Sequence, residues 1–494
     1  MLATLEKLFQ RKITRVYKNT SPKAPPGETH LLAKNPESLG PIHFVGIGGI
    51  GMSALALALH KNGYHIQGSD LSKSPMIDML LNAGIQVFSS HTAENIKHAN
   101  VLVVSSAISM RNAEVIAAQK KGGSIIKRGA LLGHITKRKP TIGITGSHGK
   151  TTTTSLVGAL LVNAHMDPLI LAGGLMHQHK SNVYLGQGSY LVAELDESDG
   201  THKEAHSHIG IVTNIDREHM AFYKTEQNLL NTFQQFFEQI KGDGTGIACA
   251  DDPLVQRVIP TLSNPLLTYG TRKNASVHLT KIKAHKDGVL FDAQMPDGSH
   301  LRDIFLAQNG YHNMLNAGAA ITAAFVLGIN EETIRQTFRH FKGVKRRFQT
   351  TGTLNGVRII DDYAHHPTEI TATLKAAKPL CEGRLFAVCE PHRYTRLKDH
   401  FEDFATSLTL ADHVITVPVF SAGEAPLQDV TSAALAHAIN KQQTPSIALD
   451  SFDATTSYLS KVLRKGDVVV CMGAGKITNL AHSLPTSPEK RDSV

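Results

Sequence analysis

The segment from residue 143 to residue 161, GITGSHGKTTTTSLVGALL, has the residue types and spacing of a phosphate-binding loop. An apolar strand pattern leads into a glycine-rich turn, and Lys150, Thr151 and a helical pattern follow. Backbone N–H groups in such a turn and at a helix N-terminus bind phosphates, the lysine neutralises their charge, and the threonine hydroxyl can hold Mg²⁺. The spacing is a shortened G-x-x-G-K-T form of the usual pattern. We predict a nucleotide site at Gly146, Ser147, His148, Gly149, Lys150, Thr151 and Thr152.

Carboxylates follow two later apolar strands, in YLVAELDESDG (190–200) and IVTNIDREHM (211–220). They are Glu194, Asp196, Glu197, Asp199, Asp216 and Glu218, with Asn214 and His219 nearby in the sequence. Ligands bind at the carboxyl ends of parallel strands, and carboxylate oxygens suit Mg²⁺. Read alone, each segment also fits a solvated loop, and His219 fits a surface histidine. Next to a nucleotide loop in the same domain, a Mg²⁺ site is the better prediction.

A second glycine loop lies nearer the N-terminus, in HFVGIGGIGMSALALALHKNGYHIQGSD (43–70). Gly46, Gly48 and Gly51 follow an apolar run, and Asp70 follows the next one. This is the layout of a dinucleotide-binding βαβ unit, which by itself suggests an NAD-dependent dehydrogenase. A dehydrogenase needs no phosphate-binding loop of the second kind, whereas a ligase needs one site for its acceptor, one for ATP and a third element for the nucleophile.

Arginine and histidine side chains are concentrated in a third region, in GVKRRF (343–348), DDYAHHPTE (361–369) and EPHRYTR (390–396). The last two segments follow apolar strand patterns. Arginine binds carboxylates with two parallel hydrogen bonds, so these segments could receive a carboxylate. The run that contains Arg346 and Arg347 could reach a phosphate when domains close, or it could be a solvated charge run.

Apolar strand patterns alternate with helical patterns three times along the 494 residues. This alternation predicts an α/β protein with parallel sheets covered by helices on both faces. We expect a basic flexible extension at 1–40, a Rossmann-like domain at 41–138, a central ATPase-type domain at 139–345 and a Rossmann-like domain at 346–494. The expected linkers are 135–140 and 341–352.

Composition excludes several classes of protein. The four cysteines are far apart and form no CxxC, which fits a reducing cytoplasm rather than disulfides or a cysteine zinc site. No apolar run is long enough to span a membrane, and no nucleic-acid-binding motif is present. The formal charge of +9 fits solubility or an anionic small-molecule substrate. We expect a cytoplasmic monomer or weak homodimer.

Ten ordered motifs between about residue 42 and residue 483 resemble the Mur ligase family. They are HFVGIGGIGMSALA, GSHGKTTTT, AGGL, AELDESDG, TNIDREHM, YHNMLNAGAA, GVKRRF, DDYAHHPTE, PHRYTR and MGAG. The resemblance implies an ATP- and Mg²⁺-dependent ligase that joins L-alanine to UDP-N-acetylmuramate in peptidoglycan synthesis. The implied UDP-sugar site contains Gly46, Gly48, Gly49, Gly51, Asp70, Ser105 and Ser106.

The same resemblance implies roles for residues of the other two domains. Lys150 would hold the phosphates, and Thr151, Glu194 and His219 would hold Mg²⁺. The nucleotide would also contact His312, Asn313 and Asp361 or Asp362, and Arg347 would stabilise the transferred phosphoryl group. The amino-acid side would consist of Tyr363, His365, Arg393 and Arg396, with His365 also among the catalytic residues.

Four departures from the family pattern leave alternatives open. Ala221 replaces a common aspartate, Ala364 a common glycine, and Thr201-His202 a common Ser-Phe pair. Glu390 stands where glutamine is common, and we expect its charge near Arg393 and Arg396. The alternatives are a sister ligase that attaches a preformed peptide, a dehydrogenase, and a catalytically silent protein with the same fold.

Overall fold

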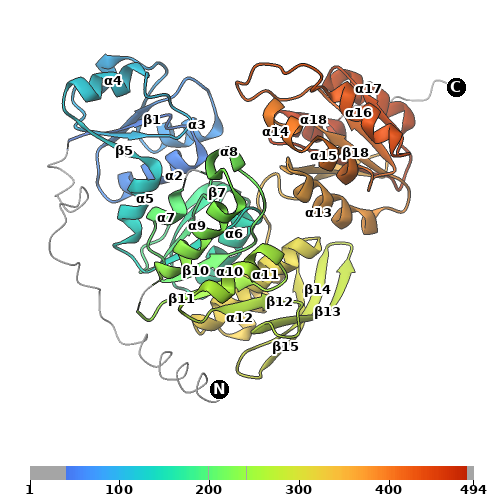
Figure 1. Ribbon diagram of the computed structural model, residues 1–494, viewed down its shortest axis with the longest axis horizontal. Coiled ribbons are helices and arrows are strands. Elements are labelled where there is room, and N and C mark those ends of the chain that lie inside the picture. The colour runs from blue at the N-terminus through green and yellow to red at the C-terminus, as the bar shows by residue number, and fades with distance from the viewer. Residues whose placement is uncertain (1–39, 199, 241, 487–494) are drawn as a thin grey trace. The chain divides into compact units, whose positions relative to one another are not determined.

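The structure is a computed structural model that describes residues 40–198, 200–240 and 242–486 (Figure 1). The predicted basic extension, apart from Gly40, and the acidic residue Asp199 lie outside the described residues. The described chain forms two compact units. The first runs to Lys281 and adds Asp292–Ile304 and Leu315–Phe341, and the second contains Ile282–Phe291, Phe305–Met314 and the residues from Lys342 onward.

The first sheet of unit one has the strand order β3-β2-β1-β4-β5, and all its pairs are parallel. Its strands are β1 (Ile42–Val45), β2 (Ile66–Ser69), β3 (Gln86–Phe88), β4 (Val101–Val104) and β5 (Ser124–Lys127). Its helices are α2 (Ile50–Lys61), α3 (Pro75–Asn82), α4 (Ala113–Lys120) and α5 (Arg128–Thr136). The parallel sheet agrees with the predicted Rossmann-like domain, and its strand order reverses between β1 and β4, where ligands bind in such folds. The glycine turn after β1 opens at that point.

The second sheet has the order β15-β14-β13-β12-β11-β10-β6-β9-β7-β8. Its strands are β6 (Thr141–Thr145), β7 (Leu169–Met176), β8 (Ser181–Leu185), β9 (Leu191–Glu194), β10 (Ile209–Val212), β11 (Thr245–Cys249), β12 (Leu267–Gly270), β13 (Val277–His285), β14 (Gly288–Gln294) and β15 (His300–Leu306). The strand β6 is parallel to both β9 and β10, so the segments after these three strands leave the same edge of the sheet. The antiparallel pair β7–β8 and the strands β12–β15 were not predicted.

Helices of the central region lie between these strands and after the last of them. They are α6 (Lys150–Asn163), α7 (Thr201–Glu204), α8 (Met220–Tyr223), α9 (Glu226–Glu238), α10 (Pro253–Val258), α11 (Tyr311–Val326) and α12 (Glu331–Arg339). The segment 310–327, GYHNMLNAGAAITAAFVL, has the pattern of a long helix with small residues, and the structure has α11 there. The helix α6 begins directly at the predicted phosphate loop, and eleven of its residues are buried. This packing fixes the helix start on which the site depends.

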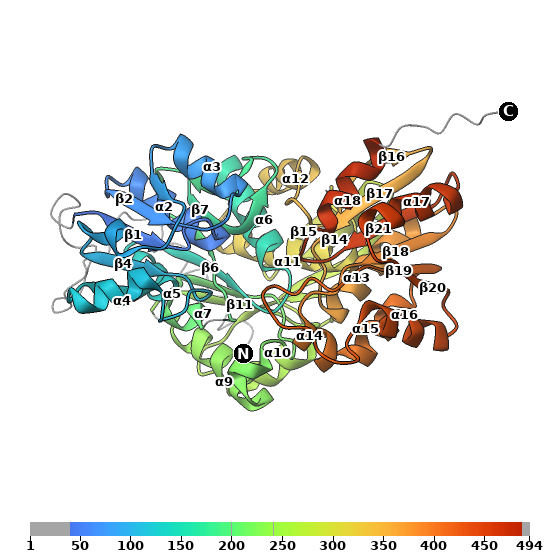
Figure 2. The same ribbon diagram turned by 90° about the horizontal axis from the view of Figure 1, so that it is seen from above.

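The third sheet, in unit two, has the order β16-β17-β21-β18-β19-β20. Its strands are β16 (Gln349–Leu354), β17 (Val357–Asp362), β18 (Leu385–Cys389), β19 (His413–Thr416), β20 (Ser446–Ala448) and β21 (Val468–Met472). Its helices are α13 (Pro367–Ala377), α14 (Tyr394–Asp399), α15 (Phe401–Leu408), α16 (Ser432–Lys441), α17 (Phe452–Val462) and α18 (Ile477–Ser483). One core packs under α13, α15 and α16 and a second under α17 and α18, on opposite faces of the sheet (Figure 2).

Two sequence expectations about connections need correction or completion. The predicted linker 341–352 ends inside β16, which pairs antiparallel with β17, because Thr350 and its neighbours form an edge strand of the third sheet. The first predicted linker, 135–140, overlaps the last residues of α5. All four cysteines are free thiols. Within the described residues, no helix has the length and apolar character needed to cross a membrane.

Candidate active site

The predicted phosphate loop joins β6 to α6 and requires glycine at two positions. Gly146 and Gly149 have φ angles of +129° and +78°, which other residues rarely adopt. A Cβ atom on Gly146 would lie 2.2 Å from Thr213 Oγ1, and one on Gly149 would lie 2.4 Å from Asn316 Oδ1. No side chain caps the start of α6. The first N–H groups of α6 therefore form a binding site for an anion such as a phosphate.

Lys150 is enclosed by the loop and by an acidic neighbour. Its Nζ donates hydrogen bonds to the carbonyl oxygens of Gly146 and Ser147, at 2.6 and 2.9 Å. It also lies 2.7 Å from Glu197 Oε2. Burial alone would lower the pKa of Lys150, but the carboxylates of Glu197, Asp196 and Glu194 together raise it above its ordinary value. The lysine is therefore a permanent positive charge at the position predicted for the ATP phosphates.

A group of possible metal ligands consists of Glu197, Glu218 and His219. One ligand atom from each lies within 4.8 Å of the others, and His219 Nε2 is 3.7 Å from Glu197 Oε1. Burial raises the pKa of Glu197 to about 7, although the Lys150 charge opposes this. Two carboxylates supply the oxygen donors that Mg²⁺ prefers. The donor set therefore fits a divalent cation next to the phosphate loop.

Glu194, which was predicted to share a metal with His219, is not a member of this group. Its Oε2 accepts a hydrogen bond from the N–H group of Gly173, at 2.7 Å. Glu197, three residues later, approaches His219 instead. The sequence placed both carboxylates in one acidic segment but contained nothing that distinguished their directions. The turn after β9 determines the directions of the two carboxylates, and the path of that turn depends on the tertiary fold.

A cavity of about 270 Å³ lies between α2 of the first sheet and β7 and β9 of the second. It is lined in part by predicted UDP-sugar residues, which are Gly49, Gly51, Ser105 and Ser106, together with Arg128, Glu194 and Asp196. The Arg128 Nη2 atom lies 3.5 Å from Asp196 Oδ2 and 3.4 Å from Thr201 Oγ1. Arg128 was not predicted, because a single arginine at a helix start carries no distinctive pattern. It gives the cavity a positive charge suited to a diphosphate.

The remaining residues of the first glycine turn are engaged by the chain itself. Asp70 Oδ2 accepts a hydrogen bond from the N–H group of Gly48, at 2.9 Å, and Asp70 Oδ1 accepts one from Ser72. Gly46 has a φ angle of +77°. In dinucleotide-binding units the corresponding acidic residue binds a ribose hydroxyl. Because Asp70 closes the glycine turn here, the geometry does not favour the dehydrogenase interpretation.

Unit two places the predicted phosphoryl-stabilising and amino-acid residues around one aromatic ring. The guanidinium carbons of Arg346 and Arg347 lie 4.9 and 5.0 Å from the centre of the Tyr363 ring. Arg347 Nη1 is 3.6 Å from Glu369 Oε1, and His365 Nδ1 is 3.1 Å from Glu369 Oε2. Cation–π contact and the shared carboxylate therefore hold Arg347, Tyr363 and His365 together.

Arg396 reaches the same group through a histidine that was not predicted. Its Nη1 lies 2.9 Å from His392 Nδ1, and the His392 ring packs 5.6 Å from His365 and stacks on Phe420 at the same distance. Burial, together with the charges of neighbouring His365 and Arg396, lowers the pKa of His392 to about 4. His392 is therefore neutral near neutral pH, and its Nδ1 can accept from the arginine.

Two predicted residues of this region point elsewhere. Arg393 Nε donates to Glu424 Oε1, at 2.6 Å. The carboxylate of Glu390, whose charge was expected near Arg393 and Arg396, is buried and accepts from the N–H group of Ile477 at 3.1 Å, so it is directed to the loop before α18. The reason is the register of the sheet, in which β18 pairs with β21 and brings Glu390 to the end of β21.

The residues predicted to contact the nucleotide from unit two are largely buried. Burial and the nearby Arg347 charge lower the pKa of His312 to about 4. Asn313 Nδ2 donates to the carbonyl of Asn309, at 2.8 Å. Asp361 is fully buried and accepts from Thr478 Oγ1 at 2.6 Å, and Asp362 accepts from two backbone N–H groups. Their nucleotide roles remain predictions.

Three family models match consecutive parts of the chain. They are "Mur ligase family, catalytic domain" at residues 41–140, "Mur ligase middle domain" at 144–324 and "Mur ligase, glutamate ligase domain" at 346–475. Two curated relatives are the UDP-N-acetylmuramate–L-alanine ligases of Brucella anthropi and Rhodospirillum rubrum. They are 43% and 41% identical to this chain, over 92% of it and over 98% and 96% of their own lengths.

Solved structures give the same comparison at the level of coordinates. The UDP-N-acetylmuramate-alanine ligase of Thermotoga maritima matches with a TM-score of 0.76 and 28% identity, over 90% of this chain and 98% of that one. A murein peptide ligase of Psychrobacter arcticus matches with a TM-score of 0.64 and 24% identity, over the same shares of the two chains. The second likeness is one of fold.

Proposed function

Because the chain belongs to the Mur ligase family, we propose that it joins L-alanine to UDP-N-acetylmuramate and hydrolyses ATP to ADP and phosphate. The observation that carries this proposal is the phosphate loop, with Lys150 held 2.7 Å from Glu197 beside a group of metal-binding side chains. The names of relatives that are more than 40% identical over nine-tenths of the chain support the choice of substrates. The product would be a precursor of peptidoglycan, made in the cytoplasm.

The proposed reaction has two steps. An oxygen of the lactyl carboxylate attacks the γ-phosphorus of ATP, the bond to the β-phosphate oxygen breaks, and an acyl phosphate and ADP result. The amine of L-alanine then attacks the acyl carbon and loses a proton, and phosphate leaves. Neither step needs a covalent bond to the protein, so the chain contributes positioning and charge stabilisation. In this scheme Lys150 binds the phosphates, and Arg347 stabilises the phosphoryl group during transfer.

We assign Mg²⁺ to the side chains around the phosphate loop, where the ion would neutralise charge on the transferred phosphate. Thr151 and His219 belong to the predicted set, and Glu197 and Glu218 join them on the geometry described above. Glu194 remains a predicted ligand whose carboxylate lines the neighbouring cavity. The carboxylates keep the site negative enough to attract a divalent cation while Lys150 keeps the adjoining phosphate position positive.

The cavity next to α2 is the proposed site of the UDP-sugar. Its glycine turn and Arg128 suit a diphosphate, and Glu194 and Asp196 bring it close to the proposed cation site. In unit two, Tyr363, His365 and Arg396 form the proposed amino-acid side, and Arg393 contributes a backbone turn with a φ angle of +68°. A monomer or weak homodimer remains the expected assembly.

The test of the proposed function is the release of ADP by the purified full-length chain. The complete mixture contains ATP, Mg²⁺, UDP-N-acetylmuramate and L-alanine, and each component is omitted in turn. Because ADP forms before the amine attacks, we expect multiple-turnover release of ADP only when all are present. Continued multiple-turnover release of ADP when UDP-N-acetylmuramate alone or L-alanine alone is omitted would contradict the proposal.

A further inference from the structure

The first half of the phosphate loop is attached to the segment that follows β10. The side-chain amide of Asn214 bonds both backbone groups of one loop residue: His148 N–H donates to Asn214 Oδ1 at 2.8 Å, and Asn214 Nδ2 donates to the His148 carbonyl at 3.0 Å. The N–H group of Ser147 donates to the Asn214 carbonyl at 3.1 Å. The amide thus forms the two-bond pairing that an adjacent strand residue would otherwise supply.

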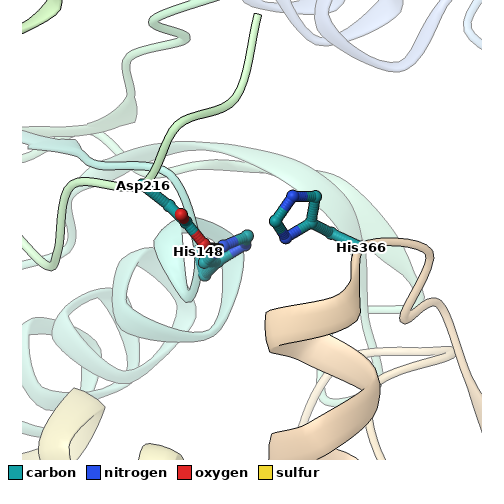
Figure 3. A group of neighbouring side chains, drawn as sticks. All are labelled: His148, Asp216 and His366. Atoms are coloured by element: carbon teal, nitrogen blue, oxygen red, sulfur yellow. Dashed lines mark hydrogen bonds and ion pairs between the residues drawn. The ribbon is translucent and has the colours of Figure 1, made fainter. Parts of the chain in front are cut away.

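The two side chains of the loop are attached to the same segment by Asp216. His148 Nε2 lies 2.9 Å from Asp216 Oδ2, and Figure 3 shows the two side chains directed toward each other. The backbone N–H group of Asp216 donates to Ser147 Oγ at 2.8 Å. His366, labelled in the same picture, is the N-cap residue of α13 in unit two. Both polar side chains between the two glycines of the loop therefore have partners in one short segment.

The close approach of the two segments depends on residues at both ends of the contact. Thr213 Oγ1 donates to the His148 carbonyl at 2.7 Å. A Cβ atom on Gly146 would lie 2.2 Å from Thr213 Oγ1 and 2.8 Å from the Asn214 carbonyl oxygen. Any side chain at position 146 would push the loop away from this segment. Glycine at this position therefore serves the contact as well as the backbone angle.

These bonds determine which groups of the loop face the triphosphate. The N–H groups of Ser147 and His148 are both directed to Asn214. Phosphate binding is therefore left to the N–H groups at the start of α6 and to the Lys150 ammonium group. The same segment continues to His219 in the proposed metal site. Attachment at Asn214 and Asp216 therefore couples the register of the loop to the position of a proposed metal ligand.

We propose that Asn214 and Asp216 are positioning residues for ATP, which act by holding the phosphate loop through His148 and Ser147. This inference rests on the proposed function and gives a positioning role to two residues of the TNIDREHM motif that the proposed ligand set does not contain. The triphosphate would not touch either side chain. Their substitution should weaken ATP binding while leaving the cavity that receives the UDP-sugar intact.

The experiment measures the Kd of a non-hydrolysable ATP analogue with Mg²⁺, the KM of each of the three substrates, and the Tm, using the full-length chain. The variants are Asn214→Ala, Asn214→Asp, Asp216→Ala and Asp216→Asn. The matched control is Asn163→Ala at the other end of α6, where Asn163 Nδ2 donates to Thr337 Oγ1 at 2.9 Å. This control removes one side-chain amide bond of the same helix without affecting the loop.

We expect Asn214→Ala to weaken analogue binding about fivefold to a hundredfold, because it removes two hydrogen bonds to His148, each contributing roughly 0.5–1.5 kcal/mol, and 1.4 kcal/mol corresponds to tenfold. Asn214→Asp should weaken analogue binding at least as much. It keeps the oxygen that accepts from the His148 N–H group, but it loses the Nδ2 donor and adds a negative charge beside the phosphates. Asp216→Asn should bind the analogue nearly as tightly as the wild type, and more tightly than Asp216→Ala. The reason is that its amide oxygen can still accept a hydrogen bond from His148. The KM values for UDP-N-acetylmuramate and L-alanine should stay within about twofold of the wild-type values.

Analogue binding by Asn214→Ala and Asn214→Asp that equals that of Asn163→Ala would overturn the proposal. An equal rise in all three KM values would also overturn it, since that is the result of general damage to the fold. If Asn214→Ala does not fold, the two conservative variants decide the question. Failure of the proposed function gives a different result, in which the wild-type chain itself shows no ADP release that depends on all three substrates.

Discussion

The Nζ atom of Lys150 lies 2.7 Å from a carboxylate oxygen of Glu197, and the two side chains are only 14% and 2% exposed. A buried ion pair of this kind is retained when both groups are needed, because removing one partner leaves an uncompensated charge. In the proposed mechanism the lysine binds phosphates and the carboxylate belongs to the cation site. When ATP and a divalent cation bind, Lys150 would pair with the phosphates and Glu197 with the cation. Two ion pairs would therefore replace the single Lys150–Glu197 pair.

Replacing Lys150 by alanine should abolish ATP turnover. The variant loses the charge that faces the phosphates and leaves Glu197 buried without its partner. We expect kcat to fall by about a hundredfold to a thousandfold or more, the scale of a lost charge-stabilising donor. Phosphate release measured with all substrates present tests this. Unchanged activity would show that the loop at 146–151 does not bind the triphosphate.

The pH dependence of kcat/KM for ATP should carry the titration of Glu197. Burial raises the pKa of this carboxyl to about 7, so it is largely protonated below that pH. The proposed role needs the ionised form, so kcat/KM should rise with pH through about 7. Glu197→Gln should be much less active and should lose this acidic limb. An unchanged limb in the variant would assign the titration to another group.

The same pKa makes a prediction about stability. A carboxyl whose pKa is raised in the folded protein stabilises the fold below its unfolded pKa and loses that contribution as pH rises through the folded value. The contribution of Glu197 should therefore decline between about pH 4.5 and about pH 7. Denaturant unfolding of the wild type and of Glu197→Gln measures the difference. If the difference in the free energy of unfolding between the wild type and Glu197→Gln stays constant over this pH range, the assignment is contradicted.

Arg128 should contribute to the binding of the UDP-sugar. Its guanidinium group lines the cavity beside α2 and is held by Asp196 and Thr201. Hydrogen bonds to charged groups contribute roughly 1.5–3 kcal/mol, so Arg128→Ala should raise the KM for UDP-N-acetylmuramate by about tenfold to hundredfold. The KM for ATP should change much less. The exposed Arg138, ten residues later, provides the control variant Arg138→Ala. Equal effects of the two variants would remove Arg128 from the site.

Glu390→Gln should affect stability rather than the amino-acid site. Burial raises the pKa of Glu390, so ionising it costs free energy in the folded protein. The contribution of Glu390 to stability is present at low pH and is lost as pH rises through its raised pKa. The Tm of Glu390→Gln should therefore increase relative to that of the wild type as pH increases. Its KM for L-alanine should stay within about twofold, since the carboxylate faces the loop before α18. A large change in that KM would place the Glu390 charge at the amino-acid site.

Local patterns were sufficient to predict the parts of the fold in which sequence and geometry are closely linked. The glycines of the two loops, the start of α6 at Lys150 and the long helix α11 follow from spacing and periodicity. The parallel pairing of the strands in the first sheet follows from its βαβ pattern. In each case the deciding contacts lie within about one supersecondary unit, so neighbouring residues contain the information.

Long-range contacts explain what could not be predicted. The contact of Glu197, rather than Glu194, with His219 depends on the turn after β9 and on the course of the chain after β10. Arg128 becomes a lining residue only because α5 lies next to the segment after β9. The direction of Glu390 follows from the pairing of β18 with β21, eighty residues later. These three contacts cannot be predicted from the sequence unless the pairing of the strands is already known.

The identity of the product tests the central claim most directly. The full-length chain is incubated with ATP, Mg²⁺ and UDP-N-acetylmuramate, together with either L-alanine or the preformed tripeptide that a sister ligase would use, and the nucleotide products are identified by mass spectrometry. We predict UDP-N-acetylmuramoyl-L-alanine and an equal amount of ADP with L-alanine, and no ligated product with the tripeptide. A product formed only with the tripeptide, or with neither, would contradict the assignment.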